Sequence, residues 1–410
     1  MKEHLLDNSP DFLKMLKNLG DVRNVCLLTG GGWKERLAWN PCDSYSLPAG
    51  KNIDDGLQRF IETHREKGNL VVGAISYELG YELYGIKNAK RTEDLPGAVL
   101  FAYDNYLEKR RGKVFACYTH KSFLTEISEI MITDTDKISG GVKPSFMPIW
   151  NRGAYTLAYE KIREYIYEGY IYQINLTQEM KAEYDGNSRL LFAGLSGNQA
   201  KMKAYLECEG FEILSLSPER FIRVEGSAIE TAPIKGTRPR GKNQEEDEKN
   251  EAELLSDEKE KAELNMITDL LRNDLGKVCA PGTVEVSENK KIEKLSNVMH
   301  TYSRIIGKLK PDIAPFSALI SMFPGGSITG CPKKKAMEII NELELSGRGF
   351  YCGNLFALDN EGLDSSILIR TLIKRGRQLS MSVGSGIVYD SLEENEYQEN
   401  LDKAKITWKG

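Results

Sequence analysis

The chain has 410 residues, of which 40% are hydrophobic and 28% charged, a composition typical of a globular protein with more than one core. Its formal net charge is -5 and it carries no basic stripe, which argues against a nucleic-acid partner. No apolar run approaches the ~18 residues that cross a bilayer, and the first segment has early acids and no signal-peptide apolar block. We therefore expect a cytoplasmic protein without membrane contact.

The cysteines and histidines restrict the kinds of metal site. There are seven cysteines, never in Cys-x-x-Cys spacing, and four histidines. An odd, scattered set of cysteines argues against a disulfide framework and against a zinc site. Acidic residues are plentiful, so a hard cation with oxygen ligands remains open.

The first part of the chain alternates short strand-like runs with polar turns. Residues 1–16 are typical of an amphipathic helix. Four apolar runs predict strands: Val25–Leu28, Leu70–Ile75, Ala98–Tyr103 and Val114–Tyr118. Thr133–Pro148, with Gly140-Gly141 and two prolines, is typical of a linker. We place a sequence division there, between residues 1–145 and 146–410.

The second part has the same strand content with single helices between the strands. Helices are predicted over Tyr155–Glu168, over the long charged stretch Gln244–Leu271 and over the last twenty residues, with a further short element at Leu190–Gly194. Strands are predicted at Ala204–Glu207, Phe211–Ser215, Phe221–Glu225, Ala228–Ala232, Phe350–Ala357, Ser366–Lys374 and Gln378–Val383. Strict β-α-β alternation is missing. The pattern favours an α+β fold with large, mostly antiparallel sheets, which often take strands from both ends of a chain.

Two glycine-rich segments are candidates for ligand contact. In Phe323–Lys333, FPGGSITGCPK, Pro332 and the apolar positions that follow predict a helix start, whose free N–H groups can bind an anion. A tight turn with a helix cap is the equally weighted alternative, and Cys-Pro after Gly330 excludes a nucleotide P-loop. In Gly384-Ser-Gly386 the third glycine of a dinucleotide site is missing, although the backbone can approach a small ligand.

Four acids and one lysine stand in positions that could carry chemistry. Glu263 falls on the apolar stripe of its helix, so it must be paired, protonated or metal-bound unless the stripe is partly exposed there. Glu396 and Glu399 share a helix face and could hold Mg²⁺, or simply form a solvated helix start. Lys235, between apolar residues and a glycine, could be a nucleophile or a loop lysine. Glu219 beside its arginine neighbour could be only a salt bridge.

Taken in order, the motifs resemble the chorismate-binding enzymes, a family that includes anthranilate, aminodeoxychorismate, isochorismate and salicylate synthases. Nine segments carry the resemblance: Ile171–Thr177, Ser217–Phe221, Pro233–Thr237, Asp269–Gly276, Pro324–Lys333, Tyr351–Gly353, Ile369–Thr371, Gly384–Val388 and Glu396–Glu399. It is strong over residues 150–410 and extends more weakly to Ser76–Gly80, which looks like the N-terminal region of the aminating members.

The resemblance implies a sandwich of antiparallel sheets with helices outside, and a pocket that holds chorismate with Mg²⁺. The magnesium ligands would be Glu263 and Glu399, with Glu396 acting through water. The substrate-binding residues would be Arg370, Tyr351, Thr329, Gly326, Ser327, Gly384, Gly386, Gln173 and Thr237. Arginine suits the second carboxylate of chorismate because its fork donates two parallel hydrogen bonds.

The resemblance also implies the reaction. Glu219 would be the general acid that protonates the departing C4 hydroxyl, and His300 would lie near the ring. Gln173 stands where the hydroxylating members carry a water-activating lysine, so amination is favoured over hydroxylation. Lys235 replaces the alanine of anthranilate synthases in Pro-Ile-Lys-Gly-Thr and resembles the aminodeoxychorismate synthases. Such a lysine would add at C2 and direct ammonia to C4.

Ammonia would come from a separate glutamine amidotransferase subunit, since no glutaminase segment is evident, and a separate lyase would complete the path to p-aminobenzoate and folate. The nearest rival function is that of anthranilate synthase component I, against which Lys235 argues. An isochorismate-type enzyme is disfavoured by Gln173. From another class, a non-catalytic chorismate-binding regulator would have no need of Glu219 and Lys235.

Overall fold

Strand β5 (Leu70–Ile75) shows how the layers of the molecule arise. Its side chains alternate: Leu70, Val72 and Ala74 join a core cluster that contains residues of both sheets, while Val71 and Ile75 join a cluster that contains helices. The strand is therefore buried on both faces. The structure, a computed structural model, describes residues 1–6, 9–87, 90, 95–132, 144–195, 200–295 and 298–405.

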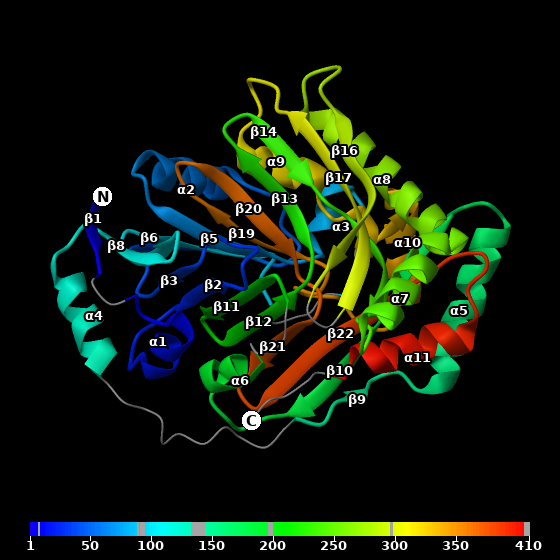
Figure 1. The fold of residues 1–410 in the computed structure, drawn as a ribbon, viewed down its shortest axis with the longest axis horizontal. Helices are drawn as coiled ribbons and strands as arrows, with labels where there is room; N and C mark the ends of the chain where they lie inside the picture. Colours follow the sequence, from blue (N-terminus) through cyan, green and yellow to red (C-terminus); the bar gives the residue numbers. More distant parts are fainter. Residues whose placement is uncertain are drawn as a thin grey trace.

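The described residues form two large antiparallel sheets that pack face to face (Figure 1). The first has the order β1 (Lys2–Leu5), β8 (Lys113–Tyr118), β7 (Tyr106–Arg110), β3 (Arg36–Ala38), β2 (Cys26–Thr29), β11 (Met202–Cys208), β12 (Phe211–Ser217), β21 (Thr371–Arg375), β22 (Gln378–Ile387), β10 (Gln173–Glu183) and β18 (Gly330–Cys331), with β9 (Met147–Pro148) on β10. The second has the order β15 (Ile234–Pro239), β17 (Val298–Lys308), β14 (Ala228–Thr231), β13 (Arg220–Glu225), β20 (Gly362–Ile367), β19 (Asn354–Leu358), β5, β6 (Ala98–Tyr103) and β4 (Asp43–Leu47), with β16 (Glu285–Lys294) on β17.

Helices cover the outer faces of this sandwich, as the sequence predicts (Figure 1). On the first sheet lie α1 (Phe12–Asn18), α4 (Ser122–Ile132) and α6 (Ser188–Leu195). The cluster on the outer face of the second sheet includes α2 (Asp55–Glu66), α5 (Arg152–Tyr167), α8 (Glu258–Val278), α9 (Pro315–Met322) and α10 (Lys333–Leu343). The remaining helices are α3 (Leu79–Leu83), α7 (Gln244–Ser256), the 3₁₀ turn η1 (Gly326–Ile328) and α11 (Glu393–Lys403). No helix among the described residues could cross a membrane.

Several predicted elements differ at their ends for local reasons. The N-terminal segment is a strand followed by α1, because the Asp11 carboxylate accepts hydrogen bonds from two backbone N–H groups and starts the helix there. The predicted helix over Gln244–Leu271 breaks at Asp257, which ends α7 and caps α8. The predicted strand Ser366–Lys374 breaks at Arg370, whose φ of 50° belongs to the left-handed region.

Two further predictions are only partly described. The strand predicted from Phe350 begins at Asn354, because residues 350–353 form a turn. Of the predicted linker, residues 133–143 lie outside the described part of the chain. Its end, Met147–Pro148, is strand β9 and pairs with β10.

Candidate active site

A cavity of about 500 Å³ is lined by residues of both sheets and of helices α8 and α11. Most of the site residues predicted from the sequence line it: Glu219, Lys235, Thr237, Glu263, Ser327, Tyr351, Arg370, Gly384, Gly386, Glu396 and Glu399. They come from segments almost 200 residues apart, and the fold gathers them around one space. The sequence motifs therefore describe one site.

Glu219 is the buried acid of this cavity. It stands just before β13 and is 7% exposed, and the hydroxyl of Ser327 donates a hydrogen bond of 3.0 Å to its Oε1. Burial raises the pKa of Glu219 to about 7, against the opposing effects of the Ser327 hydrogen bond and the Lys235 charge. A carboxyl group with such a pKa can keep its proton near neutrality and can donate it to a leaving group.

Lys235 reaches the cavity from a β-bulge. The pairing of β15 with β17 shifts register between Lys235 and Thr237, and Gly236 between them has a φ of 59°. The hydroxyl of Thr301 donates a hydrogen bond to the Lys235 carbonyl. The Lys235 ammonium lies 3.4 Å from Glu263 Oε2, and its side chain is 17% exposed. Among the described residues Glu263 is the one carboxylate within 4.0 Å of this amine, which also lines the cavity.

Three carboxylates of α8 and α11 meet lysines in the same cavity. Nζ of Lys259 lies 4.0 Å from both Glu263 Oε1 and Glu396 Oε1, and Nζ of Lys403 lies 2.6 Å from Glu399 Oε1. Burial raises the pKa of Glu396, although the Ser391 hydroxyl donates a hydrogen bond that favours the charged form. Among the described residues no three acidic, histidine or cysteine side chains already converge on one point.

The donor set nevertheless fits a hard cation. All three side chains offer carboxylate oxygens, the ligands that Mg²⁺ prefers. The Lys259 ammonium, between Glu263 and Glu396, supplies positive charge where such a cation would supply it.

Arg370 and Tyr351 also line the cavity. The left-handed backbone of Arg370 separates β20 from β21 and brings its side chain to the cavity lining. No carboxylate pairs with its guanidinium among the residues that the structure describes, and burial lowers the pKa of this group. An unpaired guanidinium in a pocket is suited to a carboxylate ligand.

Four predicted site residues lie behind the cavity lining. His300, on β17, is buried, and its Nε2 lies 2.9 Å from Glu293 Oε2. Thr329 is fully buried and donates a hydrogen bond of 2.8 Å to the Gly325 carbonyl. Gly326 packs so closely on Leu270 that an added Cβ would clash with that side chain. These three support the wall.

The fourth, Gln173, is placed directly behind Gly386. It is fully buried, and neither atom of its amide has a hydrogen-bond partner among the described residues. A Cβ added at Gly386 would lie 2.9 Å from Gln173 Nε2 and 3.6 Å from Lys235 Nζ. The amide of Gln173 therefore comes close to the Lys235 ammonium, with only a glycine between them.

Five polar residues of the cavity lining were not predicted from the sequence: Asn175, Lys259, Glu260, Ser382 and Lys403. Helical spacing could have found three of them, because Lys259 and Glu260 lie one turn before Glu263, and Lys403 lies one turn after Glu399. Asn175 lies on β10 two residues after Gln173, and β-strand periodicity gives no signal that separates it from a structural asparagine.

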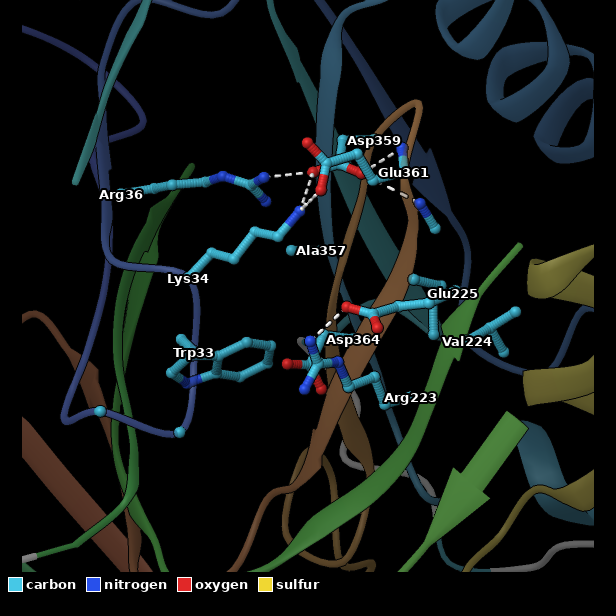
Figure 2. A pocket seen from close by; sticks show the side chains of 14 residues that line it. Trp33, Lys34, Arg36, Arg223, Val224, Glu225, Ala357, Asp359, Glu361 and Asp364 are labelled. Carbon is cyan, nitrogen blue, oxygen red and sulfur yellow. Dashed lines mark hydrogen bonds and ion pairs between the residues drawn. The ribbon is translucent and has the colours of Figure 1, made fainter. Parts of the chain in front are cut away.

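A second cavity, of about 190 Å³, lies where the β2–β3 connection meets the β19–β20 hairpin (Figure 2). Its charges are already paired: Lys34 Nζ lies 3.6 Å from Asp359 Oδ2, Arg36 forms an ion pair with the same carboxylate, and Arg223 pairs with Glu225. The Trp33 ring fills part of its wall (Figure 2). The larger cavity, with its buried acid and unpaired arginine, is the better candidate for catalysis.

Comparison with known proteins relates the chain to a family. The chain is 36% identical over 362 residues to anthranilate synthase component 1 1 of Haloarcula marismortui. The matched residues make up 82% of this chain and 74% of that protein. It is 44% identical over 254 residues to aminodeoxychorismate synthase component 1 of Escherichia coli, covering 62% of this chain and 56% of that protein. The match spans only 50% of the anthranilate synthase component 1 of Acetivibrio thermocellus.

Solved structures agree with the fold. Anthranilate synthase component I of Streptococcus pneumoniae superposes with a TM-score of 0.82 at 28% identity, covering 92% of this chain and 91% of that one. The menaquinone-specific isochorismate synthase of Escherichia coli superposes with a TM-score of 0.79 at 17% identity, over 98% of this chain and 92% of that one, which supports the fold alone. The family of chorismate binding enzymes matches residues 23–409, and the chain belongs to this family.

Proposed function

We propose that the chain is the chorismate-converting subunit of an aminodeoxychorismate synthase, which uses ammonia to replace the C4 hydroxyl of chorismate by an amino group. The observation that carries the proposal is the placement of a lysine, Lys235, and a protonatable acid, Glu219, on the lining of one cavity. An amination at C2 would need the acid but would give the lysine no part in the reaction.

The first step uses both groups. The Lys235 amine forms a bond to C2, the two ring double bonds shift, and the C4–O bond breaks. Glu219 gives its proton to the departing oxygen, so water leaves. The positive charge on the new amine is lost as a proton to solvent. A protonated Glu219 suits this role because burial raises its pKa to about 7.

The second step returns the two ring double bonds to their original positions. Ammonia forms a bond to C4, the double bonds return, and the C2–N bond breaks. Lys235 regains a proton as it departs, and the incoming ammonia loses one, so the net change exchanges a hydroxyl for an amino group and releases water. Covalent catalysis thus accounts for both the position of the new group and the lysine.

A cation fits this proposal through the carboxylates of α8 and α11. Glu263 and Glu399, with Glu396 behind them, would hold Mg²⁺ by their oxygens. A bound Mg²⁺ would neutralise and orient a substrate carboxylate. Arg370 and Tyr351, also on the cavity lining, would take the other carboxylate of the substrate, so the ring would lie between the two ends of the cavity.

The ammonia source is proposed from the relatives. Both the aminodeoxychorismate synthase and the anthranilate synthase relatives are named component 1, which implies a second component. We infer a separate glutamine amidotransferase partner and expect free ammonia to replace it in the test tube.

The second candidate is anthranilate synthase component I. Its support is the number and coverage of relatives with that name, one of which covers 82% of this chain. In that case the product would be 2-amino-substituted, and Lys235 would be a spectator. A non-catalytic regulator is the third, from a different class, and would bind chorismate without consuming it.

One experiment separates the three. The purified chain is mixed with chorismate, Mg²⁺ and excess ammonium at mildly alkaline pH, with an aminodeoxychorismate lyase in half of the samples. p-Aminobenzoate that forms only with the lyase supports the proposal. Fluorescent anthranilate without the lyase overturns it in favour of the second candidate. Unchanged chorismate that still binds the protein supports the regulator.

A further inference from the structure

A buried arginine lies behind the loop that carries Ser327. Arg348 follows α10, and its side chain is 1% exposed. It makes a two-armed ion pair with Glu344, through Nε to Oε2 at 2.9 Å and Nη2 to Oε1 at 2.6 Å. Burying a charge costs free energy unless it is paired and hydrogen-bonded. Here all three nitrogens of the guanidinium donate hydrogen bonds.

The other hydrogen bonds of this guanidinium reach the two segments that form the wall of the cavity. Nη1 donates to the carbonyl of Ile328 at 3.0 Å, and Nη2 donates to the carbonyl of Asn175 at 2.7 Å. Ile328 directly follows Ser327, whose hydroxyl donates to Glu219. Arg348 therefore fixes the backbone next to the residue that contacts the proposed general acid.

Glu344 extends the same support to strand β10. Its Oε1 accepts a hydrogen bond of 3.0 Å from the Thr177 N–H, so the ion pair holds β10 by both a carbonyl and an N–H. The loop and the strand are also joined directly, since the Asn175 N–H donates to the Thr329 carbonyl at 3.0 Å. The loop that carries Ser327 is therefore bonded both to Arg348 and to strand β10.

Residues of the N-terminal motif Ser76–Gly80 contact Arg348 in turn. The proposed reaction assigns no role to this motif. The Tyr77 ring stacks on the guanidinium, with Arg348 Cζ 4.5 Å from the ring centroid. Oε1 of Glu78 accepts hydrogen bonds from the backbone N–H groups of Arg348 and Gly349 at 2.6 and 3.1 Å. The motif therefore contacts both the guanidinium plane and the backbone of Arg348.

We propose that Arg348 is a positioning residue that, through the Ile328 and Asn175 carbonyls, sets the contact of Ser327 with Glu219. The inference rests on the general acid of the proposed function, but on no particular product, because the C4 hydroxyl must be protonated whether ammonia adds at C4 or at C2. Arginine is required since lysine offers no fork to reach Glu344 and two carbonyls together.

The test compares Arg348→Lys with Ser327→Ala and with the double variant. The alkaline limb of the pH profile of kcat/KM for chorismate consumption reports the free-enzyme acid. Glu219 faces Ser327, Lys235 and Cys352. Burial raises the pKa of Cys352 to about 12, so this thiol keeps its proton over the working range. Loss of the Ser327 hydrogen bond disfavours the carboxylate form of Glu219 and so moves the limb to higher pH.

We expect both single variants to move the alkaline limb upward by about 1 pH unit, the shift for one hydrogen bond to a charged group. The double variant should show the same limb as Ser327→Ala, because both changes break the same contact. For Arg348→Lys we also expect kcat to fall about 10²-fold, as for other small misplacements of catalytic groups. Limb shifts that add, or an unmoved limb in Arg348→Lys, would overturn the proposal.

Two further variants and one crystal structure distinguish a loss of positioning from a folding defect. Glu344→Gln keeps the shape of the side chain but removes its charge, which weakens the interaction with Arg348. It should therefore move the alkaline limb in the same direction as Arg348→Lys. Arg36→Lys changes another buried, ion-paired arginine far from the cavity and should lower the melting temperature without moving the limb. A crystal structure of Arg348→Lys tests the contact without any turnover. A Ser327–Glu219 hydrogen bond kept at 3.0 Å there would overturn the positioning role even if the enzyme makes a different product.

Discussion

The ammonium of Lys235 lies 3.4 Å from the carboxylate of Glu263, so the proposed nucleophile and a proposed cation ligand form one ion pair. This pair joins β15 to α8 across the cavity. Nucleophilic attack requires the neutral amine, so this ion pair must be broken before the reaction. Any ligand that engages the Glu263 carboxylate would weaken the pair, and substrate binding and activation of the lysine are therefore linked.

Replacing Lys235 tests covalent catalysis. Lys235→Ala should abolish formation of the 4-amino product, and Lys235→Arg, which keeps the charge near Glu263 but has no nucleophilic amine, should do the same. Products are identified by chromatography and mass. Intact-mass analysis of a stalled reaction should show an adduct on the wild type only. Full 4-amino product from either variant would remove the lysine from the mechanism.

Replacing Glu219 tests the general acid. Glu219→Gln keeps the shape of the side chain but has no proton to give, so kcat should fall by about 10²–10⁴-fold. In the wild type, kcat/KM should decline as the pH rises through about 7, the pKa to which burial raises Glu219. Glu260→Gln, at another acid of the same cavity, is the matched control and should lose much less activity. Equal losses would show that only the charge of the cavity matters.

The cation site is tested by calorimetric titration with Mg²⁺, which needs no turnover. Glu263→Gln and Glu399→Gln should each weaken binding. Lys259→Met should strengthen it several-fold, since removing a unit charge at 4 Å is worth about 1 kcal/mol in water. Activity should also be lost on chelation and return with Mg²⁺. Unchanged affinity in all three variants would place any cation elsewhere.

The buried acid Glu78 should make stability depend on pH. Burial raises its pKa to about 7, and its Oε2 has no hydrogen-bond partner among the described residues. A raised acid pKa in the folded state means that its contribution to stability is present below about 4.5 and is lost as the pH rises to about 7. Above that range ionised Glu78 costs about 3 kcal/mol.

Glu78→Gln should therefore raise the melting temperature at pH 8 and leave it nearly unchanged at pH 5, because the amide keeps the acceptor for the Arg348 and Gly349 N–H groups. Thermal unfolding at the two pH values measures the difference. An equal change at both pH values would mean that Glu78 is charged in the folded protein throughout.

The sequence predicted the parts of this molecule in which local pattern and fold agree. The runs Leu70–Ile75 and Ala98–Tyr103 form strands with those bounds, since their apolar side chains are buried on both faces. The sequence-predicted strand over Ser366–Lys374 was wrong at Arg370, because a left-handed arginine has no signature in residue type. That backbone turn brings the side chain to the cavity, so local rules failed at a site residue.

The candidate site was predictable where motifs carried it and not where only tertiary contacts did. Glu219 and Lys235 stand in recognisable segments, Glu263 falls on the apolar stripe of its helix, and the cavity unites the three. The support at Arg348 depends on pairings between residues that are distant in sequence, such as Arg348 with the carbonyl of Asn175. Neither periodicity nor composition encodes such a pairing.

Strand β5 pairs with β19, so residues 70–75 meet residues 354–358 in the middle of the second sheet. On the ribosome, β5 is made when more than two thirds of the chain has yet to be synthesised. Its five buried side chains and its free edge cannot meet β19 until residues 354–358 have been made. Such long-range pairing slows folding and exposes apolar strands to aggregation. Newly made chains should therefore depend on chaperones, and a truncated N-terminal fragment should be insoluble.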